Sequence, residues 1–120
     1  RKKGRRMNPK RGEVELEFDG KKYTGRVTLD VVMRIETSLG KSIIEQLQDL
    51  QNAQTKLTEM VAIITPVIRA GGNDLKDKEV ADLIWRGGIT NSMRMCAAIL
   101  AKAVNPFEAE SGNEEEVEKD

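Results

Sequence analysis

The stretch Thr55–Gly72, TKLTEMVAIITPVIRAGG, is the longest apolar segment of the chain. Its apolar residues recur at steps of three and four, which gathers them on one broad face of a helix. These residues are Leu57, Met60, Val61, Ile64, Val67 and Ile68, and Ile63 widens the face further. We therefore expect a central helix that packs against several neighbours.

The ends of this central helix are also indicated by the sequence. Thr55 is the expected N-cap, because its hydroxyl can accept a hydrogen bond from an unpaired backbone amide. The Gly71–Gly72 pair is a natural stop, since glycine adopts the left-handed conformation without a steric penalty. Pro66 lies inside the helix, so we expect a kink there or a helix in two parts. The β-branched residues of Val61–Ile68 leave a strand as an alternative, which the length and the caps disfavour.

A β-hairpin is predicted over Gly12–Thr28. Its first strand alternates apolar and acidic residues, which gives one apolar and one polar face: Val14, Leu16 and Phe18 against Glu13, Glu15 and Glu17. Asp19-Gly20 supplies the turn. The glutamates then face Lys22, Thr24 and Arg26 of the return strand as cross-strand pairs.

Two features of this hairpin bear on packing and partners. Gly25 interrupts the return strand and indicates a bulge or a close approach of another backbone. A two-stranded ribbon is marginal alone, so its apolar face must lie on the helices. Its two open edges could accept a strand from another chain and so support a homo-oligomer.

Four further helices are predicted. Thr28 caps Leu29–Leu39, which ends at Gly40, and Ser42 with Glu45 forms a capping box that opens a short second helix. Asp77 caps a helix to about Trp85, and Thr90 caps the last helix to about Val104. The residues expected to face inward are Val31, Val32, Ile35 and Leu39; Ile44, Leu47 and Leu50; Val80, Leu83 and Ile84; and Met93, Cys96, Ala97, Leu100, Ala103 and Val104.

The expected fold class is therefore α+β, with an N-terminal antiparallel β-hairpin packed on a small bundle of about five helices.

The formal net charge of zero conceals two oppositely charged ends of the chain. Residues 1–11 carry seven Lys or Arg and no acid, and residues 108–120 carry seven Asp or Glu and one Lys. We expect a disordered basic arm at 1–11, a single α+β domain at 12–106 and a disordered acidic tail at 107–120.

The composition argues against catalysis. The chain has no histidine and one cysteine, Cys96, so His-based nucleophile pairs and an intramolecular disulfide are excluded, and a reducing compartment is favoured. No phosphate-loop, CxxC or metalloprotease motif occurs, and no stretch is apolar enough to span a membrane. We expect no enzyme activity, and no catalytic, cofactor-binding or metal-ligating residues.

Several residue groups of the sequence could in principle form a site. Glu13, Glu15 and Glu17, and likewise Glu114–Glu116, are better explained as solvated surfaces than as cation sites. Cys96 is expected in the core rather than as a reactive thiol. The basic arm is better explained as a solvated arm than as a nucleic-acid contact, because no aromatic residues are interleaved. Trp85 with Ile89 could form an exposed partner-binding spot, but core packing is favoured.

The order of elements resembles a family of small phage proteins, the gene-transfer-agent type of tail assembly chaperone. The resemblance covers residues 7–105, and RKKGRR lies outside it. It rests on Gly12-Glu13-Val14, Asp19-Gly20, Gly20-Lys21-Lys22-Tyr23, Thr28-Leu29, Glu36, Leu39-Gly40, Ser42-Ile43 and Ile68-Arg69-Ala70-Gly71-Gly72. Their order and spacing carry the resemblance, because each motif alone is weak.

The resemblance implies a non-catalytic protein of phage or prophage tail morphogenesis in the cytoplasm of a bacterial host. The leading hypothesis is a chaperone that binds the tape measure protein, tail tube subunits or both. Free hairpin edges and methionines on helix faces, Met60, Met93 and Met95, would suit such binding. The alternative is a structural subunit of the tail tube or its terminator. A small DNA-binding regulator that uses the basic arm is a third hypothesis.

Overall fold

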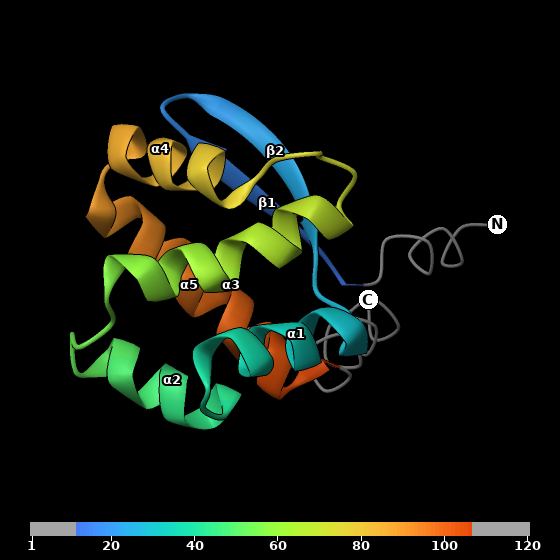
Figure 1. The fold of residues 1–120 in the computed structure, drawn as a ribbon, viewed down its shortest axis with the longest axis vertical. Coiled ribbons are helices and arrows are strands. Elements are labelled where there is room, and N and C mark those ends of the chain that lie inside the picture. Colours follow the sequence, from blue (N-terminus) through green and yellow to red (C-terminus); the bar gives the residue numbers. More distant parts are fainter. Residues whose placement is uncertain (1–11, 107–120) are drawn as a thin grey trace, which may run out of the picture.

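The computed structural model describes residues 12–106. A two-stranded antiparallel hairpin leads into five helices, which confirms the α+β class (Figure 1). The elements are β1 Glu13–Phe18, β2 Lys21–Arg26, α1 Leu29–Leu39, α2 Ile43–Gln51, α3 Leu57–Ala70, α4 Asp77–Gly87 and α5 Ile89–Val104. The basic arm, the acidic tail and Glu114–Glu116 lie outside the described residues.

The hairpin has the predicted register. Asp19 and Gly20 both have positive φ, 54° and 82°, the conformation that a two-residue hairpin turn requires. Each glutamate of β1 faces its expected partner, Glu13 opposite Arg26, Glu15 opposite Thr24 and Glu17 opposite Lys22. On the other face Leu16 and Phe18 are buried in the core.

Helix α3 is the centre of the fold. It packs against β2, α1, α4 and α5, and Figure 1 shows it in the middle of the molecule. It runs as one helix from Leu57 to Ala70 through Pro66, so the strand alternative and the helix in two parts are both wrong. Pro66 is half-buried and lines a hollow on the surface of α3. The buried residues of α3 are Met60, Ile63, Ile64, Thr65, Val67 and Ile68.

Two predicted N-caps are wrong for the same reason. Helix α3 begins after Lys56, whose backbone N–H donates to Glu59 Oε1 at 2.8 Å. Helix α4 begins after Lys76, whose N–H donates to Glu79 Oε1 at 2.8 Å. A carboxylate in the first turn thus satisfies the amide that precedes each helix, as in a capping box. Asp77 is therefore the first residue of α4 rather than its cap, and α3 does not need the hydroxyl of Thr55 as a cap.

The hydroxyl of Thr55 has another partner. Its Oγ1 accepts a hydrogen bond from Gln46 Nε2 at 3.1 Å, which ties the start of α3 to α2. Thr90 is also not a cap, because Gly88, with φ 92°, turns the chain and α5 begins at Ile89. By contrast, Thr28 caps α1 and Gly40 ends it in the left-handed conformation, as predicted.

The inward face of α2 differs from the prediction. Ser42 caps the helix as expected, but Ile44 is 59 % exposed, and Ile43 and Gln46 are buried in its place. The Ile43 N–H donates to Glu36 Oε2 at 2.9 Å, which ties the start of α2 to α1. The face with spacing 43, 46 and 50 is then the one that turns inward.

Glycines allow β2 to approach the end of α3 closely. A Cβ on Gly71 would lie 1.9 Å from the carbonyl oxygen of Thr24, and one on Gly25 would lie 2.6 Å from Val67 Cγ1. The strand pairing continues through Gly25 without a bulge. Of the two explanations offered for Gly25, the close approach is therefore correct.

A three-membered ion cluster joins α2 to α3. Lys41 Nζ lies 2.6 Å from Asp49 Oδ2 and 2.9 Å from Glu59 Oε2. Partial burial opposes ionisation of Glu59, but the hydrogen bonds from the Lys56 N–H and from Lys41 outweigh it and lower the pKa of this carboxyl. The two carboxylates raise the pKa of Lys41.

We expect Gly71→Ala to lower the free energy of unfolding by about 2–4 kcal/mol, because the added methyl group overlaps the Thr24 carbonyl. Urea unfolding followed by far-UV circular dichroism measures this loss. Gly87→Ala is the matched control, since its Cβ would be 3.3 Å from Phe18 Cα and needs only a small adjustment. Equal losses in the two variants would contradict the close approach.

We expect Glu59→Gln to remove part of the acid sensitivity of folding. A carboxyl whose pKa is lower in the folded chain stabilises it above the ordinary value of 4.5 and loses that contribution as the pH falls through the lowered value. The free energy of unfolding should therefore fall less steeply in acid for Glu59→Gln than for the wild type. Equal slopes in the variant and the wild type would contradict a stabilising role of the ionised Glu59 carboxylate.

Candidate interaction site

Two of the glutamates considered as a cation site pair with basic residues of the facing strand. Arg26 Nη2 lies 3.1 Å from Glu13 Oε2, and Lys22 Nζ lies 3.7 Å from Glu15 Oε2. Within residues 12–106 no group of three or more His, Cys, Asp or Glu is placed to hold a metal ion. Cys96 is a core residue, as predicted, and burial raises the pKa of its thiol to about 12.

Trp85 is where the structure departs most from the prediction. Its side chain is 68 % exposed and that of Ile89 is 40 % exposed, so core packing is wrong for both. The inward face of α4 is occupied by Val80 and Ile84, which are four residues apart. Because Trp85 follows Ile84, it lies about 100° further round the helix, on the solvent side. The alternative, an exposed partner-binding spot, fits.

Trp85 belongs to an apolar groove of about 780 Å³. Elements from three parts of the fold build it, namely β2, the start of α3, and α4 with the connection before it. We call it the α4 groove, and its apolar lining is Tyr23, Leu57, Leu75, Ala81, Leu83 and Trp85. A concave apolar surface that presents a tryptophan and a tyrosine has the composition of a protein-binding hot spot.

The rim of the α4 groove is charged, and its acids are engaged within α4. Glu79 accepts the N–H of Lys76, and Asp82 Oδ2 lies 3.0 Å from Arg86 Nε. Lys76 and Lys78 line the groove with exposed side chains. Lys21 adds a third cation, since its Nζ is 5.5 Å from the centre of the Tyr23 ring. The rim therefore carries charges of both signs.

A family model described as phage tail tube protein, GTA-gp10, matches residues 11–105. The chain belongs to this family. The match spans the hairpin and all five helices, so it confirms the resemblance at the level of a phage tail protein of the gene-transfer-agent type. Neither the curated proteins nor the solved structures gave a match.

In this GTA-gp10 family member the edges of the hairpin are partly covered. On β1, Asn91 Nδ2 donates to the carbonyl oxygen of Glu17 at 2.8 Å, and the Glu17 N–H donates to Met95 Sδ at 3.4 Å. On β2, Asn73 Nδ2 donates to the carbonyl oxygen of Thr24 at 2.8 Å. An added strand would have to displace these side chains, so the structure favours the α4 groove over the edges as a contact surface.

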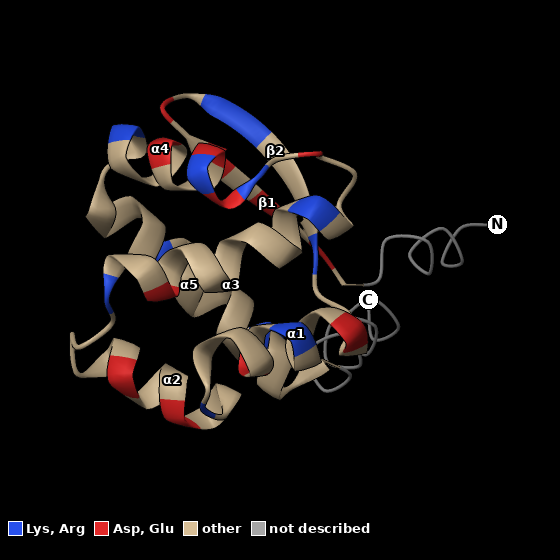
Figure 2. Ribbon diagram, viewed as in Figure 1, with Lys and Arg blue, Asp and Glu red and all other residues tan. Residues whose placement is uncertain are grey.

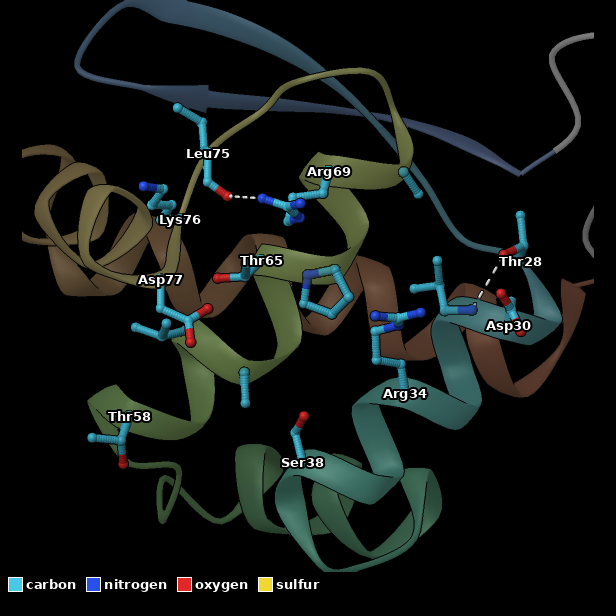
Figure 3. A pocket seen from close by; sticks show the side chains of 15 residues that line it. Thr28, Asp30, Arg34, Ser38, Thr58, Thr65, Arg69, Leu75, Lys76 and Asp77 are labelled. Carbon is cyan, nitrogen blue, oxygen red and sulfur yellow. Dashed lines mark hydrogen bonds between the residues drawn. The ribbon is translucent and has the colours of Figure 1, made fainter.

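A second hollow, of about 810 Å³, lies between α1 and α3 (Figure 3). It is polar and carries both signs of charge, with Arg34 and Arg69 facing acids that include Asp30 and Asp77. Arg69 is held in place, because its Nη1 donates to the carbonyl oxygen of Leu75 at 2.9 Å. Charged and hydroxyl residues make up most of its lining, which makes this hollow a weaker binding surface than the α4 groove.

Within residues 12–106, none of the helices has the length and the apolar character needed to cross a bilayer.

We expect the fluorescence of Trp85, the only tryptophan in the chain, to report this exposure. In dilute solution acrylamide should quench it efficiently, because the indole faces solvent. Trp85→Ser should change the free energy of unfolding by no more than about 0.5 kcal/mol, as for other surface positions. Weak quenching in a monomeric sample, or a loss of several kcal/mol, would show that Trp85 is buried after all.

Proposed function

We propose that this protein is a structural subunit of a phage tail, of the tube or of its terminator, assembled in the bacterial host cell. The observation that carries the proposal is the family match, which extends over the whole described fold and names a tail tube protein. The α4 groove supports it, since a tube subunit needs an exposed surface for a neighbouring subunit.

The proposal assigns no chemical reaction to the protein. Its support is what the candidate groups do in the fold. Glu59 and Glu79 accept the amides that precede two helices, and Glu13 and Glu15 pair with cations of the facing strand. The thiol of Cys96 is buried and protonated at neutral pH. We expect the surface, rather than a reactive group, to serve the function.

The assembly chaperone hypothesis has less support than the tube subunit. It relied partly on methionines presented on helix faces. Met60 is instead buried in the core, Met93 and Met95 are only half-exposed, and Met95 accepts the N–H of Glu17. The methionines therefore do not form an exposed surface for the tape measure protein, and binding to that protein remains a hypothesis. The basic arm on which the DNA-binding hypothesis relied lies outside the described residues.

The decisive measurement is the copy number of this polypeptide in finished particles. We expect purified particles from the encoding strain to contain it in stoichiometric amounts, in many copies per tail, by quantitative mass spectrometry. A host cytoplasmic protein of similar size serves as the control for contamination. Absence from finished particles, combined with loss of tails when the gene is deleted, would contradict the tube subunit and favour the chaperone.

A further inference from the structure

We propose that two copies of this chain exchange their N-terminal halves, residues 12–51, by straightening the connection between α2 and α3 into helix. In the resulting domain-swapped dimer, α2 and α3 of each chain form one helix from Ile43 to Ala70. Each N-terminal half then packs on the C-terminal half, residues 57–106, of the other chain. The inference goes beyond the proposed function and does not depend on it.

The connection between α2 and α3 is closed by an unfavourable backbone conformation. Ala53, which is not a glycine, has φ 57°. Its N–H donates to the carbonyl oxygen of Leu50 at 3.1 Å, and the next N–H, of Gln54, donates to that of Asp49 at 2.7 Å. These two bonds form a Schellman ending, in which the residue at the position of Ala53 is usually glycine. An alanine there brings its Cβ close to the backbone, so closing the turn costs free energy.

The sequence of this connection does not require a break between the two helices. The other helix connections of the described chain contain glycine, as at Gly40, Gly71 and Gly88. The connection after α2, residues 52–56, contains neither glycine nor proline. All five of its residues are of types that helices accommodate. A short, strained connection without a helix breaker favours domain swapping.

The apolar spacing of α2 continues in phase through the connection and into α3. Alternating steps of three and four residues, which place side chains on one stripe of a helix, join eight positions. These are Ile43, Gln46, Leu50, Ala53, Leu57, Met60, Ile64 and Val67. None of them is charged, and Figure 2 shows the charges of α2 and α3 as short coloured bands on otherwise tan helices. A single helix over this range is therefore a competing conformation that the sequence pattern itself supports.

A second copy is the partner that fits, because its halves are identical to those already packed together. The contacts of β2 and α1 with α3, and of α2 with α5, join the two halves and would reform between chains. Lys41 Nζ lies 2.9 Å from Glu59 Oε2, and this ion pair would then link two chains. Figure 1 shows the chain reversing between α2 and α3, where the two arrangements differ. The dimer thus keeps the core contacts and relieves Ala53, and mass action favours it at high concentration.

The exchange leaves the α4 groove intact. Tyr23 belongs to the N-terminal half, whereas Leu57, Leu75 and Trp85 belong to the C-terminal half. In the dimer each groove is therefore built from two chains with the same lining. Exchange joins two copies through their cores, and both grooves stay open to further partners.

Ala53→Gly tests the role of the strained turn. Glycine adopts this φ without penalty and disfavours a continuous helix, so the variant should form less dimer than the wild type, by about tenfold or more. Both proteins are unfolded in urea, refolded at the same high concentration and separated by size-exclusion chromatography. Ala98→Gly, at an exposed position within α5, is the matched control and should keep the wild-type dimer fraction. A wild type that refolds only to monomer, or equal dimer fractions in wild type and Ala53→Gly, would overturn the proposal.

A disulfide trap distinguishes exchange from association through surfaces. Asn91 and Glu17 lie in different halves, and Asn91 Nδ2 donates to the carbonyl oxygen of Glu17 at 2.8 Å. In the double variant Glu17→Cys with Asn91→Cys, the new disulfide lies within one chain in the monomer and joins two chains in the exchanged dimer. Non-reducing electrophoresis in denaturant should therefore show covalent dimers from the dimer fraction alone.

Glu17→Cys by itself is the control for random oxidation and should give single chains from both fractions. A dimer fraction of the double variant that yields only single chains would show association through surfaces and overturn the exchange. The copy number in finished particles is independent of these results, so the two proposals can fail separately.

Discussion

The contact between β2 and the last turn of α3 is the constraint on which the rest of the structure depends. Gly71 meets the Thr24 carbonyl and Gly25 meets Val67 at distances that leave no room for a side chain. Asn73 secures the same region, because its Nδ2 donates both to Thr24 and to the carbonyl oxygen of Ile68. A two-stranded hairpin is only marginally stable alone, and this contact fixes it on the bundle.

The position of the hairpin in turn creates the α4 groove. With β2 held against α3, Tyr23 comes to lie along α4 and forms one wall of the groove. Helix α4 buries Val80 and Ile84 and leaves Trp85 outside. Meanwhile Asn91 and Met95 from α5 cover part of the β1 edge. The packing that stabilises the fold therefore protects the backbone edges and leaves an apolar side-chain surface available for a partner.

Helix caps and turn residues predicted most of the fold, because each depends only on residues that are close to it in the sequence. Thr28 and Gly40 bound α1, and Asp19-Gly20 sets the turn, through contacts within a few positions of the chain. The site was predicted only in part. The sequence indicates Trp85 as a candidate, but its exposure depends on which face of α4 meets the core. Leu57 and Leu75 were not associated with it, since only the folded chain brings them to Tyr23.

The sequence by itself determined the hairpin register, the number of helices and the central place of α3. Alternation and three- to four-residue spacing specify which residues can share a face, and turn residues specify where an element ends. The tertiary structure alone decided how each helix is rotated about its axis. In α2, Ile43, whose N–H donates to Glu36, is buried and Ile44 is exposed. When a helix has more apolar residues than one neighbour can cover, packing selects the face that is buried, and the remaining apolar residues stay exposed.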